Sequence, residues 1–102
     1  MDEKPIDWRG SSLDDLKAVP EDARIAAGFA LHKVQHGQDP GDFKVISDWG
    51  PGVMELQLND GTGSWRVVYV AKFEEAIYVL HSFQKKTQKT SKSDVSIITR
   101  RW

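Results

Sequence analysis

The second half of the chain contains three apolar segments that are separated by two short, polar segments. The apolar segments are VMELQL (53–58), SWRVVYVA (64–71) and IYVLHSF (77–83). They are rich in β-branched and aromatic residues, and in the first of them Met54, Leu56 and Leu58 alternate with polar residues, as in a half-buried strand. The intervening NDGTG and KFEEA segments are short enough for tight turns. The pattern therefore predicts an antiparallel meander of three strands.

The N-terminal part carries a different pattern, that of a short strand followed by two helices. Residues 6–8 are the strand candidate, and two serines follow that can cap a short helix. Pro20 ends that helix and can also occupy the first turn of the next. Apolar residues at helical spacing carry the second helix to about Gln35 or His36, and Gly37 is a natural stop. We expect a helical hairpin.

The segments on either side of the meander complete the expected fold. Residues 37–52 are rich in Gly, Pro and Asp and indicate a long loop, in which residues 43–46 are the candidate for an extended piece. After the third strand, Ser91 and Asp94 have capping-box spacing at the start of a terminal helix. The order predicts an α+β fold, β-α-α-β-β-β-α, with an N-terminal strand and helical hairpin packed on an antiparallel sheet.

Composition indicates one small domain. The 102 residues, 39% hydrophobic and 28% charged, suffice for a single core, so residues 1–102 are expected to form one domain. No apolar run approaches the roughly 20 residues of a membrane span, and the N-terminus MDEKPIDW is acidic rather than signal-like. We therefore expect a soluble, cytoplasmic protein without a membrane partner. Since the chain has no cysteine, thiolate metal sites and disulfides are excluded.

The positive charge is concentrated in the C-terminal third. Residues 1–64 contain 6 Lys or Arg against 12 Asp or Glu, whereas residues 65–102 contain 8 against 3. Four lysines follow the third strand: Lys85, Lys86, Lys89 and Lys92. A basic surface of this kind suits phosphate groups, although it does not by itself identify a nucleic acid.

Arg66 is the most informative single residue of this region. An arginine inside so apolar a strand costs stability unless its guanidinium reaches solvent or an anion. Because the third strand folds back antiparallel to the second, Arg66 is expected to approach residues 82–85. One basic locus would then contain Arg66, His81, Lys85 and Lys86.

Such a locus suits RNA cleavage by attack of a 2′-hydroxyl on its own phosphate. Arg and Lys would hold the charge that develops on the phosphate, and a histidine such as His81 is the side chain suited to proton transfer near neutral pH. Tyr69 or Phe83 could stack on a base. The alternative is purely structural: the lysines are a solvated strand exit, Arg66 pairs with a carboxylate such as Glu55, and His81 is a satisfied residue of the sheet.

His32 and His36 are four residues apart on the second predicted helix, a spacing that could place two metal ligands on one face. The sequence offers no cysteine, no Glu in an HExxH pattern and no obvious third ligand. We therefore interpret the pair as part of a polar helix face. No metal ion or other cofactor is expected.

The segment WRVVYVAKFEEAIYVLHSFQKKTQKTSKSDV resembles the C-terminal half of phage-derived, HigB-like toxins of the RelE/ParE superfamily. Those toxins show an arginine followed by an apolar strand, then VLHxFxKKTxKTP and a helical ending. The strand, the helical hairpin and GPGVMELQL stand in the expected order as well, so the resemblance spans essentially the whole chain. It implies a RelE-like fold.

The resemblance also implies a function. It points to the toxin of a type II toxin-antitoxin module, which inhibits translation as a metal-independent endoribonuclease that cleaves mRNA, usually on the ribosome. Its partner would be an antitoxin, often of helix-turn-helix type, in a toxin-antitoxin hetero-oligomer. The positively charged active-site positions would fall on Arg66, Lys85 and Lys86, with His81 as a further candidate. The lysines of the strand exit, Lys89 and Lys92 included, would bind RNA phosphates.

One departure from the family pattern keeps other functions open. The motif that usually reads WELR is MELQ here, so Gln57 stands where a basic residue could orient substrate. Two alternatives therefore remain: a ParE-like inhibitor of DNA gyrase that cleaves nothing, and an inactive binding module. Fold-level resemblance does not separate them, because this scaffold carries more than one activity.

Overall fold

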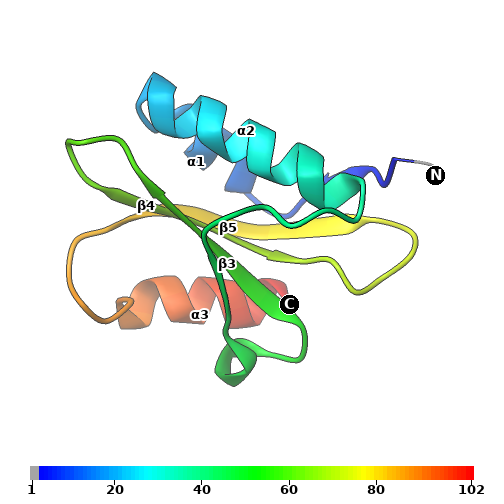
Figure 1. The fold of residues 1–102 in the computed structure, drawn as a ribbon. Coiled ribbons are helices and arrows are strands. Elements are labelled where there is room, and N and C mark those ends of the chain that lie inside the picture. Colours follow the sequence, from blue (N-terminus) through cyan, green and yellow to red (C-terminus); the bar gives the residue numbers. More distant parts are fainter. Residues whose placement is uncertain (1–2) are drawn as a thin grey trace.

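The computed structural model describes residues 3–102, which form three α-helices and one five-stranded sheet (Figure 1). In chain order the elements are β1 (Ile6–Trp8), α1 (Ser12–Lys17), α2 (Glu21–Gln35), β2 (Phe43–Val45), a 3-10 helix (Ser47–Trp49), β3 (Val53–Asn59), β4 (Ser64–Val70), β5 (Ile77–Lys85) and α3 (Lys92–Arg101). The predicted α+β class is confirmed, and the elements follow the predicted order with one further strand, β2, before the meander. None of these helices has the length and apolar character that crossing a bilayer requires.

The strands lie in the order β1-β5-β4-β3-β2. Strands β3, β4 and β5 form the predicted antiparallel meander, and β2 is the extended piece expected near residues 43–46, paired antiparallel with β3. The sheet is not antiparallel throughout, because β1 runs parallel to β5, with Ile6 opposite Ile77. The pairing of β1 ends at Val79, so the later residues of β5 form an edge of the sheet.

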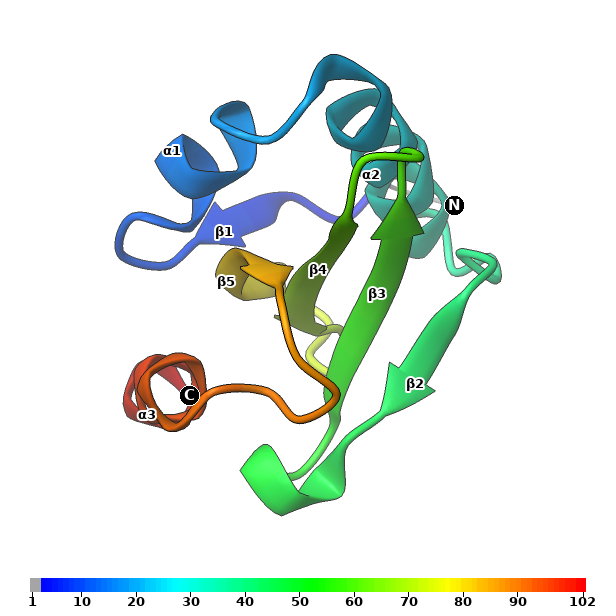
Figure 2. The same ribbon diagram turned by 90° about the vertical axis from the view of Figure 1, so that its left-hand side faces the viewer.

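Side-chain alternation gives the sheet two apolar faces, each covered by helix (Figures 1 and 2). Leu56, Val67 and Tyr69 pack with α1 and α2 on one face. On the other face, residues such as Val53 and Val68 pack with Ile98 of α3. Helices α1 and α2 therefore cover one face of the sheet and α3 covers the other.

An irregularity in β5 decides which of its side chains lie on the α3 face. The β4–β5 register shifts between Val68 and Tyr69, so that Tyr69 is opposite Val79 whereas Val68 is opposite His81, and Leu80 is the extra residue. Such a bulge reverses the alternation that follows it. His81, Phe83 and Lys85 therefore continue on the α3 face, together with Arg66.

Helix α3 is held to the rest of the protein along its length. Ser91 caps it by accepting a hydrogen bond from the backbone N–H of Asp94 at 3.1 Å, which confirms the predicted cap. Ile98 is fully buried against the sheet. At the far end, Arg101 donates to the carbonyl of Leu80 at 2.9 Å and to the hydroxyl of Ser11 at 3.2 Å. The helix, marginal alone, is thus fixed by tertiary contacts.

Candidate nucleic-acid interface

Three of the predicted site residues line one open groove at the end of the sheet where β4 begins and β5 ends. The groove has a volume of about 430 Å³, and we call it the basic groove; it is lined by Ser64, Arg66, Lys85, Lys86, Thr87 and Gln88. Arg66 is opposite Phe83 and Ser64 is opposite Lys85 in the β4–β5 pairing. Arg66 therefore approaches residues 82–85, as expected from the antiparallel pairing.

Arg66 is held by its own sheet as well as being open to the groove. Its Nε lies 3.4 Å from Oε1 of Glu55, with 12% of the Arg66 side chain and 2% of the Glu55 side chain exposed. One terminal nitrogen donates to the carbonyl of Trp65 at 3.0 Å. The carboxylate partner suggested by the structural interpretation is thus present, yet the guanidinium still forms part of the groove wall. Its remaining N–H groups are the ones available to a bound anion.

His81 lies deeper than the sequence suggested. Its Nε2 is 2.7 Å from Oδ1 of Asp94, and only 7% of its side chain is exposed. The ring stacks on Phe83 with 5.0 Å between the ring centroids and an interplanar angle of 17°. Asp94 also accepts a hydrogen bond from the Ser91 hydroxyl through its other oxygen at 2.7 Å. His81 therefore joins the start of α3 to β5 and supports Phe83.

A second groove, of about 420 Å³, adjoins the basic groove. Lys85, Lys86 and Thr87 line both grooves. The wall of the second groove also contains Phe83, which is 9% exposed, and Lys89. The predicted RNA-binding residue Phe83 is therefore mostly buried, and His81 stacks on one face of its ring. Lys92 is exposed at the first position of α3.

Tyr69 does not belong to this surface. Its side chain is 1% exposed and packs in the core beneath α2, on the face of the sheet opposite Arg66. Burial, followed by the negative charge of Asp39, raises the pKa of Tyr69 to about 12. The expectation that Tyr69 stacks on a base is therefore corrected. The strand pattern already contained the signal, because residues 66 and 69 differ by an odd number and face opposite sides of a regular strand.

Two residues of the α3 face were not singled out from the sequence. Lys44 of β2 is exposed and is opposite Glu55 in the β2–β3 pairing, which adds a cation to that face. Asp94 had been interpreted only as a cap and is also the partner of His81. The contacts join segments that are distant in sequence, so no local pattern indicates them.

Potential metal ligands gather elsewhere, on the α2 side of the protein. In the part of the chain from Glu3 onward, one group of three such side chains lies close together: Glu3, His32 and His36. The basic groove contains no comparable group within that range. The charged side chains in its wall are the cations Arg66, Lys85 and Lys86.

Comparison with known proteins identifies the family of this chain. Residues 14–102 match the family described as Phage derived protein Gp49-like (DUF891). The chain belongs to this family. Gp49-like proteins are a RelE-like, toxin-like family, and the five-stranded α+β fold is compatible with a RelE-like arrangement. No curated protein matches the chain.

Proposed function

We propose that this Gp49-like protein is the toxin of a two-component toxin-antitoxin module and inhibits translation by cleaving mRNA. The observation that carries the proposal is the convergence of Arg66, Lys85 and Lys86 on one open groove at the end of the sheet. A toxin-like family and a RelE-like fold give that groove its context. The HigB-like character inferred from the LHSFQKKTQKT segment belongs to the same proposal.

The groove can perform the electrostatic part of RNA cleavage. Attack of a 2′-hydroxyl on the adjacent phosphate builds negative charge on the nonbridging oxygens, and fixed cations stabilise that charge. The ion pair with Glu55 holds Arg66 in place, so its guanidinium needs little reorganisation to meet a phosphate. The ammonium group of Lys85 or Lys86, on the same groove, could protonate the departing 5′-oxygen, while the proton of the attacking 2′-hydroxyl would pass to solvent water in the open groove.

His81 acts as a positioning residue in this proposal. Its Nε2 is 2.7 Å from the Asp94 carboxylate and its Nδ1 is buried, so neither ring nitrogen is open to a bound substrate. Its stacked contact with Phe83 fixes the wall of the second groove. Lys89 and Lys92 would extend the phosphate-binding surface along the strand of RNA.

The partners follow from the same surface. An antitoxin with an acidic segment would neutralise the lysines that otherwise bind RNA, and the helix-turn-helix class is the one that the resemblance implies. The substrate would be mRNA, reached on the ribosome in the cytoplasm. Phosphate chemistry of this kind needs no cofactor, because the 2′-hydroxyl is the nucleophile.

A binding module without nuclease activity is the second candidate, and one observation favours it. The charge of Arg66 is partly balanced by Glu55, and the neighbouring position on β3 carries Gln57 instead of a cation. A protein that only binds a target, DNA gyrase among the possibilities, would tolerate this arrangement. The difference between the two candidates lies in whether RNA is cut.

The test is induction of the protein in bacteria without an antitoxin, with protein, RNA and DNA synthesis followed separately by labelling. We expect protein synthesis to fall first and primer extension to reveal new 5′ ends within coding regions. The Lys85→Ala, Lys86→Ala variant should lose both effects, because these side chains are at least partly exposed and their removal leaves the core intact. Lys17→Ala, an exposed lysine of α1, is the matched control and should remain toxic.

Other outcomes would reject the proposal in distinct ways. If DNA synthesis falls first, the gyrase interpretation replaces it. If translation stops while mRNA stays intact, the protein blocks without cleaving. Full toxicity of the double lysine variant would remove the basic groove as the site.

A further inference from the structure

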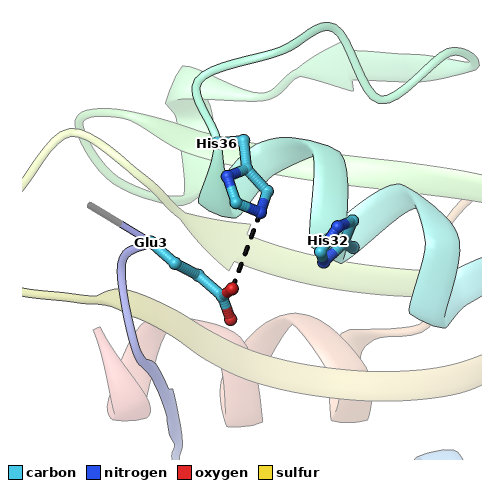
Figure 3. Close-up of side chains that lie close together, drawn as sticks. All are labelled: Glu3, His32 and His36. Carbon is cyan, nitrogen blue, oxygen red and sulfur yellow. Dashed lines mark ion pairs between the residues drawn. The ribbon is translucent and has the colours of Figure 1, made fainter. Parts of the chain in front are cut away.

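Glu3 lies beside the two histidines of α2 that the sequence left without a third ligand (Figure 3). The ligand atoms of Glu3, His32 and His36 all lie within 4.8 Å of one another. The carboxylate Oε2 of Glu3 is 3.6 Å from Nε2 of His36. Figure 3 shows the carboxylate and both rings gathered on one side of the helix.

The helix itself places the two histidines together. Residues four apart lie one above the other on the same face of an α-helix. Accordingly, the ring centroids of His32 and His36 are 4.5 Å apart, in an edge-to-face arrangement. Two imidazoles in this relation can share one metal ion without any change in the backbone.

Glu3 is brought to this face by a set of hydrogen bonds centred on Gln35. The N–H of Lys4 donates to the carbonyl of Gln35 at 3.2 Å, and the Gln35 amide donates to the carbonyl of Lys4 at 2.7 Å. The same amide donates to Oε1 of Glu3 at 3.1 Å, which leaves Oε2 directed to His36. The third ligand is therefore oriented by a neighbouring side chain, as ligating carboxylates in metal sites usually are.

The charges near the three side chains include the end of α2 and Glu3, which favour a cation, and the exposed Lys33, which opposes it. His32 lies in the last turn of α2 and His36 is its C-cap, where the helix dipole places partial negative charge. The nearest lysine of the N-terminal segment, Lys4, directs its ammonium away to the carbonyl of Ala71 at 2.8 Å. The carboxylate of Glu3 supplies a full negative charge.

We infer that Glu3, His32 and His36 form a binding site for a divalent transition-metal ion, with Zn²⁺ as the preferred occupant. Two imidazole nitrogens and one carboxylate oxygen are a common zinc ligand set, and zinc accepts a water as its fourth ligand. Ligand atoms about 2.0–2.2 Å from a tetrahedral ion are roughly 3.4 Å from one another. The Glu3–His36 distance nearly meets this requirement, and His32, whose ligand atom is within 4.8 Å of the others, would have to approach by side-chain rotation. Glu3 and His32 are exposed, so the ion and its water can enter from solvent.

A bound ion would tie the segment that leads into β1 to the end of α2. It would bind the folded chain and not the unfolded one, so the midpoint of thermal unfolding should rise with the concentration of the metal. The site is separate from the basic groove, and its occupation would act on stability rather than on RNA chemistry.

The test uses the full chain without an affinity tag, because an added polyhistidine segment would supply competing ligands. Titration calorimetry with Zn²⁺ should give one ion per chain, and Co²⁺ should produce the intense visible absorption of a tetrahedral site. Glu3→Gln, His32→Ala and His36→Ala should each weaken binding by at least about tenfold, since each removes one of three ligands. Glu21→Gln, an exposed carboxylate at the other end of α2, is the matched control and should bind as the unaltered chain does.

Two results would overturn the inference. The first is a lack of saturable binding at Zn²⁺ concentrations up to about 100 μM. A dissociation constant above that value would be far weaker than that of structural zinc sites. The second is unchanged affinity of Glu3→Gln, which would show that the carboxylate is not a ligand. Circular dichroism of each variant keeps the result interpretable, because it shows whether the fold survives the change.

Discussion

The guanidinium Nε of Arg66 lies 3.4 Å from the carboxylate Oε1 of Glu55, across strands β4 and β3. Both side chains are largely enclosed, so each desolvated charge depends on the other. Gln57 joins the pair by donating from its amide to the same Glu55 oxygen at 3.4 Å. The pair therefore has two consequences, since it stabilises the sheet and fixes a cation at the groove.

Arg66→Ala should destabilise the protein by about 3–5 kcal/mol, because it leaves the Glu55 carboxylate buried without its counter-ion. Adding Glu55→Gln should restore a large part of that loss. The free energy of unfolding, measured in urea for the two single variants and the double variant, gives the coupling between the residues. A loss below about 1 kcal/mol in Arg66→Ala would show that the ion pair contributes little.

The same double variant separates stability from toxicity. If Arg66 binds phosphate, Arg66→Ala with Glu55→Gln should fold and yet fail to stop growth. Glu55→Gln alone keeps the guanidinium and should remain toxic. A toxic double variant would assign Arg66 a structural role only.

Asp94→Ala should loosen the start of α3. The change removes the partner of His81 Nε2 and the acceptor of the Ser91 hydroxyl, at a cost of about 1–3 kcal/mol. Thermal unfolding gives the loss of stability, and amide hydrogen exchange in α3 should locate it. Ser96→Ala, an exposed position of the same helix, should change stability by less than about 0.5 kcal/mol. Equal effects of the two changes would argue against the role given to Asp94.

Gln57→Arg should strengthen RNA binding. Gln57 is opposite Arg66 in the β3–β4 pairing, so a new guanidinium there would lie on the same face, with Glu55 between to offset repulsion. The affinity for a single-stranded RNA with blocked 2′-hydroxyls, measured against salt, should show a log–log slope steeper by about 0.7. Gln38→Arg is the control: Gln38 is exposed in the loop after α2, so this variant should leave the slope unaltered. An unchanged slope for Gln57→Arg would place RNA away from this face.

Tyr69→Phe should flatten the loss of stability in alkaline solution. Burial, with Asp39 second, raises the pKa of Tyr69 to about 12, above the value near 10 of an unfolded tyrosine. The folded chain thus keeps a proton that the unfolded chain loses, and the free energy of unfolding falls by about 1.4 kcal/mol per pH unit between about pH 10 and 12. This contribution is fully present below pH 10. Urea unfolding of the unaltered protein and of Tyr69→Phe across that range tests the prediction. If the free energy of unfolding falls equally with pH in both proteins, the prediction is wrong.

Much of the fold could be predicted because its signals are local. The turn after β3 contains Asp60 and Gly61, with Gly61 at a positive φ of 87° and Asp60 accepting from the N–H of Thr62 at 2.9 Å. Such turns, together with Pro20 and Gly37, mark where elements end. The parallel pairing of β1 with β5 was not predictable in the same way, because no local pattern records which distant strand it joins.

The candidate site was only partly accessible from the sequence for a related reason. Strand alternation and antiparallel pairing bring Arg66 close to Lys85, as predicted. The bulge at Leu80, however, determines that Leu80 and His81 lie on the same face although they are adjacent in sequence, and an extra residue in a strand has no signature here. The proximity of Glu3 to His36 could not be predicted either, because the two residues are distant in sequence and only the fold brings them together.

The parallel pairing of β1 with β5 also determines when the sheet can form during synthesis of the chain. Ile6 pairs with Ile77, which is synthesised about 70 residues later. At 5–20 residues per second, this separation corresponds to roughly 4–14 s. Helix α3, which anchors to β5 and to the loop before α1, is made later still. The basic groove and its supporting helix therefore come together only after residues 77–101 have been made, so a nascent chain that lacks them does not carry the finished surface.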